Sequence, residues 1–156
     1  MCIMRISEYF KRIANSKDKA GKILSADDVR VILRDALGSR LNPHVLIILS
    51  DEAYTTINRD QVLKAFKISN LGTKEYRPEV FDCDNFAFAM KAVVDEEGRK
   101  LWSLSYEYAF GIVYGSIPTP HAINWFITSD LEVLFIEPQS GEIFAPIGEN
   151  IVFLYT

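Results

Sequence analysis

The chain has 156 residues, a net charge of −4 and 49% hydrophobic residues, which is the balance of an ordinary globular protein. It has no lysine- and arginine-rich run, so its sequence gives no reason to expect a nucleic-acid partner. Its longest apolar run, Val45–Leu49, is too short to cross a membrane, and residues 1–14 lack the continuous apolar segment of a secretory signal. The two cysteines, Cys2 and Cys83, form no disulfide framework. We therefore expect a single domain over residues 1–156 in the cytoplasm, away from membranes.

The first part of the chain has helical periodicity. Apolar residues recur at helical spacing over residues 3–15, which predicts a first helix. Ser25 and Asp28 form a capping-box pattern ahead of a second apolar stripe. Gly38 follows this stripe as a C-terminal stop signal, so we expect a second helix between Ser25 and Gly38.

The middle of the chain contains two further predicted helices. His44–Leu49 is either a short buried strand or the start of a helix, because its pattern does not separate the two. Asn58 is a candidate N-cap for a helix over Arg59–Lys67. A fourth helix begins at Cys83 and ends near residues 95–98.

After Gly98 the composition changes to that of strands. The segments expected to form strands are Trp102–Tyr108, Phe110–Tyr114, His121–Thr128, Glu132–Ile136 and Ile151–Tyr155. A chain that is mainly helical over residues 1–98 and mainly strand over residues 99–156 has an α+β layout. We expect its N-terminal helices to pack against a C-terminal antiparallel sheet.

Cys83 is the first residue in the chain whose side chain is a candidate for catalysis. With Asp82 as the N-cap, Cys83 lies at the first helical position, where the helix dipole favours a thiolate. The carboxylates of Asp82 and Asp84 disfavour a thiolate, so such an ion would need a cation nearby. Alternatively, Cys83 is a small buried hydrophobic residue without chemistry.

A histidine and a glutamate follow on two predicted strands. Ser129–Asp130 is a turn between the strands that start at His121 and end before Glu137. Because these two residues lie almost symmetrically about the turn, hairpin pairing brings their side chains together. A carboxylate beside an imidazole fixes its tautomer and raises its basicity, and the imidazole could then accept the proton of a thiol.

Three motifs resemble one known family. They are Phe81–Ala87, His121–Phe126 and Ile136–Gln139, and they are similar to the papain-like domain at the C-terminus of the Marasmius agglutinin and its microbial relatives. The resemblance covers roughly residues 76–143, and nothing in residues 1–75 looks like the sugar-binding trefoil of the agglutinin. It implies a single papain-like domain that acts as a cysteine hydrolase, a peptidase or amidase that forms a thioester intermediate.

The same resemblance implies roles for single residues. Cys83 would be the nucleophile, His121 the general base and Glu137 the acid that orients it. Active relatives depend on calcium or manganese, for which Asp82 and Asp84 are candidate ligands here, although the triad itself requires no cofactor.

The sequence leaves several points of this interpretation open. The oxyanion donor beside the Cys83 N–H is Gln139, Asn85 or Asn124, and the sequence does not choose among them. The substrate would be a peptide or another amide. Two alternatives to the hydrolase are a catalytically silent relative that acts as a binding module, and a transglutaminase-like acyl transferase. The oligomeric state does not follow from the sequence.

Overall fold

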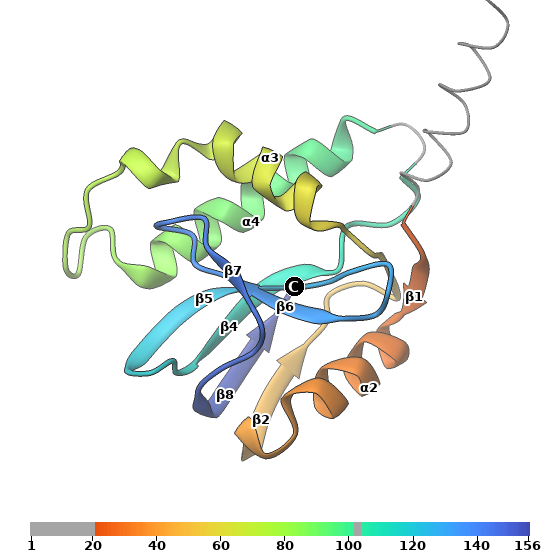
Figure 1. Ribbon diagram of the computed structural model, residues 1–156. Coiled ribbons are helices and arrows are strands. Elements are labelled where there is room, and N and C mark those ends of the chain that lie inside the picture. The colour runs from red at the N-terminus through yellow and green to blue at the C-terminus, as the bar shows by residue number, and fades with distance from the viewer. Residues whose placement is uncertain (1–20, 102–103) are drawn as a thin grey trace, which may run out of the picture.

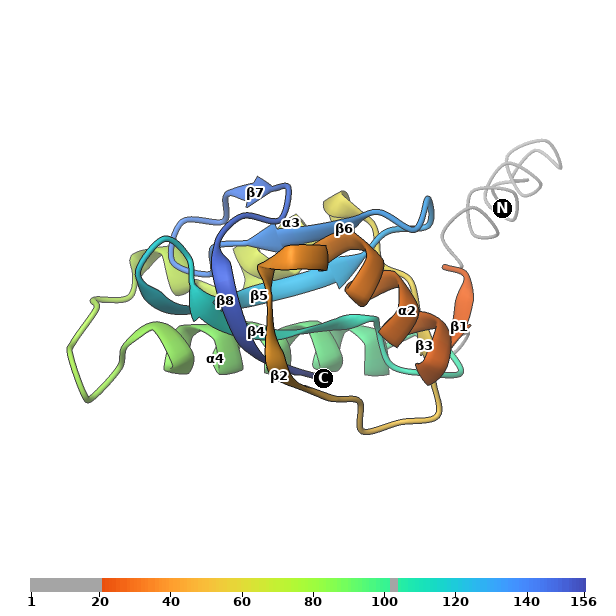
Figure 2. The same ribbon diagram turned by 90° about the horizontal axis from the view of Figure 1, so that it is seen from below.

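The computed structural model describes residues 21–101 and 104–156, and the helix expected over residues 3–15 lies outside this part. Its helices are α2 (Ala26–Leu37), α3 (Arg59–Ser69) and α4 (Cys83–Arg99). The central sheet contains, in spatial order, β2 (Leu41–Ile48), β8 (Glu149–Tyr155), β4 (Phe110–Ser116), β5 (Pro120–Ile127), β6 (Val133–Ile136) and β7 (Ile143–Phe144). Strands β1 (Ile23–Ser25) and β3 (Ala53–Thr55) pair separately. Helices α3 and α4 lie on one face of the sheet and α2 on the other, which gives an α+β fold (Figure 1; Figure 2).

The capping predictions for α2 are confirmed. The Asp28 N–H donates to Ser25 Oγ at 3.1 Å, and the Ser25 N–H donates to the Asp28 carboxylate at 3.0 Å. Gly38 ends the helix with φ at 50°, a conformation that suits glycine because it has no Cβ. Local sequence signals thus determine both ends of this helix.

Helix α3 is confirmed in the same way. The Gln61 N–H donates to Asn58 Oδ1 at 2.9 Å, and the Asn58 N–H donates back to Gln61 Oε1 at 3.0 Å. This reciprocal pair satisfies two backbone groups that a helix start otherwise leaves without partners. It also fixes the orientation of the Gln61 amide.

The sheet is mixed rather than antiparallel, which corrects the prediction. Strand β2 pairs in parallel with β8, whereas the other neighbouring strands of the sheet are antiparallel. The ambiguous segment after residue 43 is therefore strand, and it brings the helix-rich part of the chain into the sheet. Pro43 is tolerated because β2 is an edge strand of this sheet.

Side chains along β5 alternate between two packed layers. Ile123, Trp125 and Ile127 contribute to the core shared with α2. Phe126 contributes to the core shared with α3 and α4, and Ala122 packs near the start of α4. This period of two decides which face each functional residue of β5 can reach.

The predicted strand over residues 102–108 is wrong in its described portion. Residues 104–108 form no strand, and Tyr108 makes only an isolated bridge with Thr55. The composition of this segment is typical of a strand because the segment contributes to the core. Tyr108, for example, packs in the core without belonging to the sheet. Within the described residues, no helix combines the length and the apolar character needed to cross a bilayer.

Candidate functional site: a histidine–glutamate pair in an open cavity

His121 lies near the start of β5, directly after the stiff segment Pro118-Thr119-Pro120. Its Nε2 atom is 2.7 Å from Glu137 Oε2, and both side chains are 21% exposed. The predicted contact between these two residues is therefore confirmed. It forms because β5 and β6 pair as the predicted antiparallel hairpin.

The turn after β6 holds the Glu137 carboxylate. The Gln139 N–H donates to Glu137 Oε1 at 3.0 Å, while Oε2 contacts the imidazole. The Gly141 N–H donates to the Glu137 carbonyl, and Gly141 has φ at 77°, which favours glycine. Each carboxylate oxygen therefore has its own partner, and the acid has a defined orientation.

The His121–Glu137 pair lines an open cavity of about 520 Å³. The other lining residues are Ile117, Pro118, Thr119, Ile123, Glu142, Phe144 and Ile147. Glu142 and Phe144 were not predicted from the sequence. The Ser140–Gly141 turn signal could have indicated them, because the hairpin from β6 to β7 brings them beside Glu137.

Cys83 is the first residue of α4 and Asp82 its N-cap, as predicted. Cys83 is half-buried and packs against a small cluster formed by Ala87, Ile112 and Ala122. It lines a second cavity of about 370 Å³. The other residues of this cavity are Asp82, Asp84, Phe88, Ile112, Tyr114, Ala122 and Phe153.

Cys83 and His121 line different cavities. Ala122 belongs to the small cluster against which Cys83 packs, and His121 lines its cavity together with Ile117 and Ile123. No hydrogen bond joins the sulfur to the imidazole in the described chain, and the two cavities share no lining residue. Of the predicted alignment of thiol, imidazole and acid, the structure shows the imidazole–acid contact.

The acids around Cys83 interact with each other. A hydrogen bond with Asp82, followed by burial, raises the pKa of Asp84 above its ordinary value. The Asn85 N–H donates to Asp84 Oδ1 at 2.9 Å, and Asn85 Oδ1 accepts from the Asp82 N–H at 3.1 Å. Among residues 21–101 and 104–156, no group of three or more His, Cys, Asp or Glu side chains could hold a metal ion.

The three candidate amide donors lie in different surroundings. Asn124 is fully buried, and its Nδ2 donates to the carbonyls of Ala87 at 2.9 Å and Gly111 at 3.1 Å. Both of its donor positions are thus occupied. The Asn85 side chain caps α4, and Gln139 contributes a backbone N–H to the Glu137 carboxylate.

The fold and site define an α+β protein with a fixed histidine–glutamate pair in an open cavity. The sequence profile described as Agglutinin C-terminal matches residues 54–143, which is more than half of the chain. The chain therefore belongs to this family, in agreement with the resemblance to the C-terminal domain of the Marasmius agglutinin. Among curated proteins, none matches the chain.

Two of the solved structures with a similar fold are matched over most of this chain. One is a complex of PSL1a with E64, which is 27% identical, has a TM-score of 0.75 and is matched over 86% of this chain and 51% of its own. The other is the Polyporus squamosus lectin bound to the human-type influenza-binding epitope Neu5Acα2-6Galβ1-4GlcNAc. It is 27% identical with a TM-score of 0.70, matched over 86% of this chain and 49% of its own. The chain thus spans about half the length of these structures.

These findings overturn the prediction of a cysteine hydrolase. The family is that of an agglutinin domain, and a lectin is among the solved structures that share the fold. The designation of the chain as a hydrolase, a thiol protease or the carrier of a catalytic triad is accordingly wrong. The binding-module alternative fits the comparisons better.

Proposed function

We propose that the chain is a non-enzymatic binding module that keeps a papain-like arrangement of helix and sheet. Support for the arrangement comes from α4, which begins at a cysteine and packs against the sheet that bears the His121–Glu137 pair. Support for a binding role comes from the agglutinin family and from the saccharide named with the Polyporus squamosus lectin. That saccharide belongs to a chain twice as long, so the ligand class must be argued from this chain's own cavity.

The observation that carries the proposal is the chemistry of the His121–Glu137 cavity. Its volume of about 520 Å³ suits a small ligand. Phe144 and Ile147 supply an apolar wall, while Glu142 supplies a carboxylate that can accept hydrogen bonds from hydroxyl groups. Such a combination suits a saccharide, which has both apolar C–H faces and many hydroxyl donors.

The His121–Glu137 bond adds a further hydrogen-bonding position. When Nε2–H donates to Glu137, the neutral imidazole keeps Nδ1 as an acceptor, and no described side chain occupies that atom. The pair therefore presents a fixed acceptor to a ligand hydroxyl. Because Gln139 N–H holds the other carboxylate oxygen, this acceptor is pre-organised before a ligand arrives.

Charge selects among saccharides. The cavity is lined by Glu137 and Glu142 and by no Lys or Arg, and the whole chain carries a net charge of −4. Carboxylates repel an acidic sugar, and their repulsion is strongest at low ionic strength. The ligand we propose is therefore a neutral saccharide, unlike the sialylated epitope named with the lectin.

The test is titration of the ¹⁵N-labelled protein with neutral mono- and disaccharides and with a sialylated trisaccharide, followed by NMR. We expect saturable shifts in β5 and the β6–β7 turn with a neutral sugar only. Glu142→Gln should weaken binding about ten-fold because a charge-assisted hydrogen bond is lost. Glu149→Gln is the matched control, because Glu149 is an exposed glutamate outside the cavity. The proposal fails if no neutral sugar binds, or if both variants weaken binding equally.

A further inference from the structure

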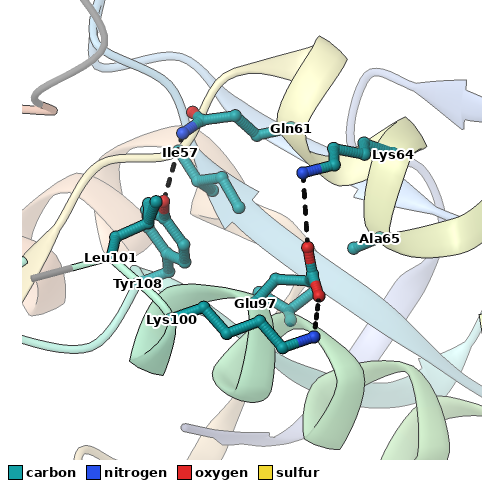
Figure 3. Close-up of a pocket in the computed structure, with 9 residues that line it drawn as sticks. Ile57, Gln61, Lys64, Ala65, Glu97, Lys100, Leu101 and Tyr108 are labelled. Atoms are coloured by element: carbon teal, nitrogen blue, oxygen red, sulfur yellow. Dashed lines mark hydrogen bonds and ion pairs between the residues drawn. The ribbon is translucent and has the colours of Figure 1, made fainter. Parts of the chain in front are cut away.

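A third cavity lies between α3, α4 and the segment that leads into β4. Its volume is about 160 Å³, and it is separate from both cavities described above. It is lined by Ile57, Gln61, Lys64, Ala65, Val94, Glu97, Lys100, Leu101 and Tyr108 (Figure 3). A cavity of about 150 Å³ with apolar walls can hold a molecule the size of benzene.

The floor of this α3–α4 cavity is apolar. Ile57, Ala65 and Val94 are at most 1% exposed and belong to the core shared by the two helices. Leu101 forms part of the wall. A ligand that fills this space must therefore bring an apolar body of about one ring or a chain of similar volume.

The mouth of the cavity is cationic. Lys64 Nζ lies 3.4 Å from Glu97 Oε2, and Lys100 Nζ lies 2.6 Å from Glu97 Oε1 (Figure 3). Two ammonium groups thus share one carboxylate and leave a net positive charge, in a chain that is acidic overall. Both lysines are more than half exposed, whereas Glu97 is only 17% exposed, so the ammonium groups can turn toward an additional anion.

The opposite side of the cavity offers a hydroxyl donor. Gln61 Nε2 donates to the Tyr108 hydroxyl at 3.1 Å (Figure 3). The amide cannot reverse these roles without losing the bond between Gln61 Oε1 and the Asn58 N–H. Tyr108 therefore accepts from Gln61, and its own O–H remains able to donate, since no acceptor for it occurs among the described residues.

We infer that the α3–α4 cavity binds a small monocarboxylate whose apolar body is about the size of one ring. The body fills the space above Ala65 and Val94, and the carboxylate accepts hydrogen bonds from the ammonium groups of Lys64 and Lys100. This charge complementarity selects an anion over a neutral analogue of the same shape. The site is independent of the saccharide proposal, because it shares no residue with the His121–Glu137 cavity.

The experiment is an NMR titration of the ¹⁵N-labelled chain with phenylacetate and, separately, with neutral phenylacetamide. We expect saturable phenylacetate binding with a Kd of about 1 mM or below, and shifts confined to α3 and the second half of α4. Phenylacetamide should bind at least about ten-fold more weakly because the charged hydrogen bonds are lost.

Substitutions that remove the charge but keep the shape of the cavity test the role of the two lysines. Lys64→Met with Lys100→Met should weaken phenylacetate binding about ten-fold. Lys67→Met is the matched control, because Lys67 is an exposed lysine of the same helix that does not line the cavity. The inference is overturned if phenylacetate does not saturate, if the amide binds equally well, or if the control variant loses as much affinity as the double variant. The comparison of acid and amide on the parent protein decides the question even if a variant folds poorly.

Discussion

Asn124 offers the most direct test of how α4 is joined to the sheet. Its Nδ2 donates to the carbonyl of Ala87 in α4 and to that of Gly111 in β4, and the side chain is fully buried. Asn124→Ala removes both hydrogen bonds, each of which contributes about 1 kcal/mol, so we expect a loss of about 2 kcal/mol in the free energy of unfolding. Asn124 Oδ1 has no hydrogen-bond partner among the described residues, so its removal breaks no further hydrogen bond.

The isosteric change Asn124→Asp should be worse than truncation. It keeps the shape of the side chain but replaces the donor with an acceptor that faces two carbonyl oxygens, at a cost of about 4 kcal/mol. Lowering the pH should recover part of this loss, because a protonated carboxyl regains one donor.

The assay is urea unfolding at equilibrium, followed by tryptophan fluorescence. The control is Asn42→Ala, which also removes two hydrogen bonds, one to Asn150 Oδ1 and one from the His44 N–H, but both are exposed and water can replace them, so stability should change by no more than about 0.5 kcal/mol. The reasoning is refuted if Asn124→Asp is as stable as Asn124→Ala, or if neither differs from the Asn42 control. Either result would mean that the amide does not join helix to sheet.

Three further changes test other parts of the fold by the same urea assay. Gly111→Ala should cost about 3 kcal/mol, since a Cβ there would collide with the Tyr155 carbonyl oxygen and with the Trp125 ring, and a loss below about 1 kcal/mol would contradict this packing. A hydrogen bond from Ser25 lowers the pKa of Asp28. The stabilisation that this bond gives the folded state is therefore present at neutral pH and is lost as pH falls through that lowered pKa. The stability difference between the parent and Ser25→Ala should shrink in acid, and a constant difference would refute the linkage. Burial raises the pKa of Glu107, so the parent should lose stability relative to Glu107→Gln as pH rises through that raised pKa, and the opposite slope would contradict it.

Local signals in the sequence were sufficient for the helix ends. Ser25 with Asp28, and Asn58 with Gln61, make hydrogen bonds across only three residues, so the pattern and the structure correspond directly. The His121–Glu137 contact was also predictable, because a short turn fixes which ends of a hairpin lie together.

The position of Cys83 relative to His121 was not predictable in the same way. Sequence order places the cysteine at a helix start and the histidine at a strand start, but not the face of the sheet to which the histidine points. That face depends on how β5 is seated in the sheet, and a shift of one residue would exchange Ala122 and His121. The α3–α4 cavity was equally hidden, because Lys64 and Glu97 come from separate helices.

Because β2 pairs in parallel with β8, the sheet of this protein is completed late in folding. Leu41 pairs with Ile151, so two segments that lie far apart in the sequence must meet before the sheet is complete. Strand β8 also lies between β2 and β4, and without it the sheet would be split. Such distant pairing slows folding because the entropy of closing a long loop is lost before any contact forms. Amide protons of β2 should therefore become protected from exchange after those of the β4–β5 hairpin.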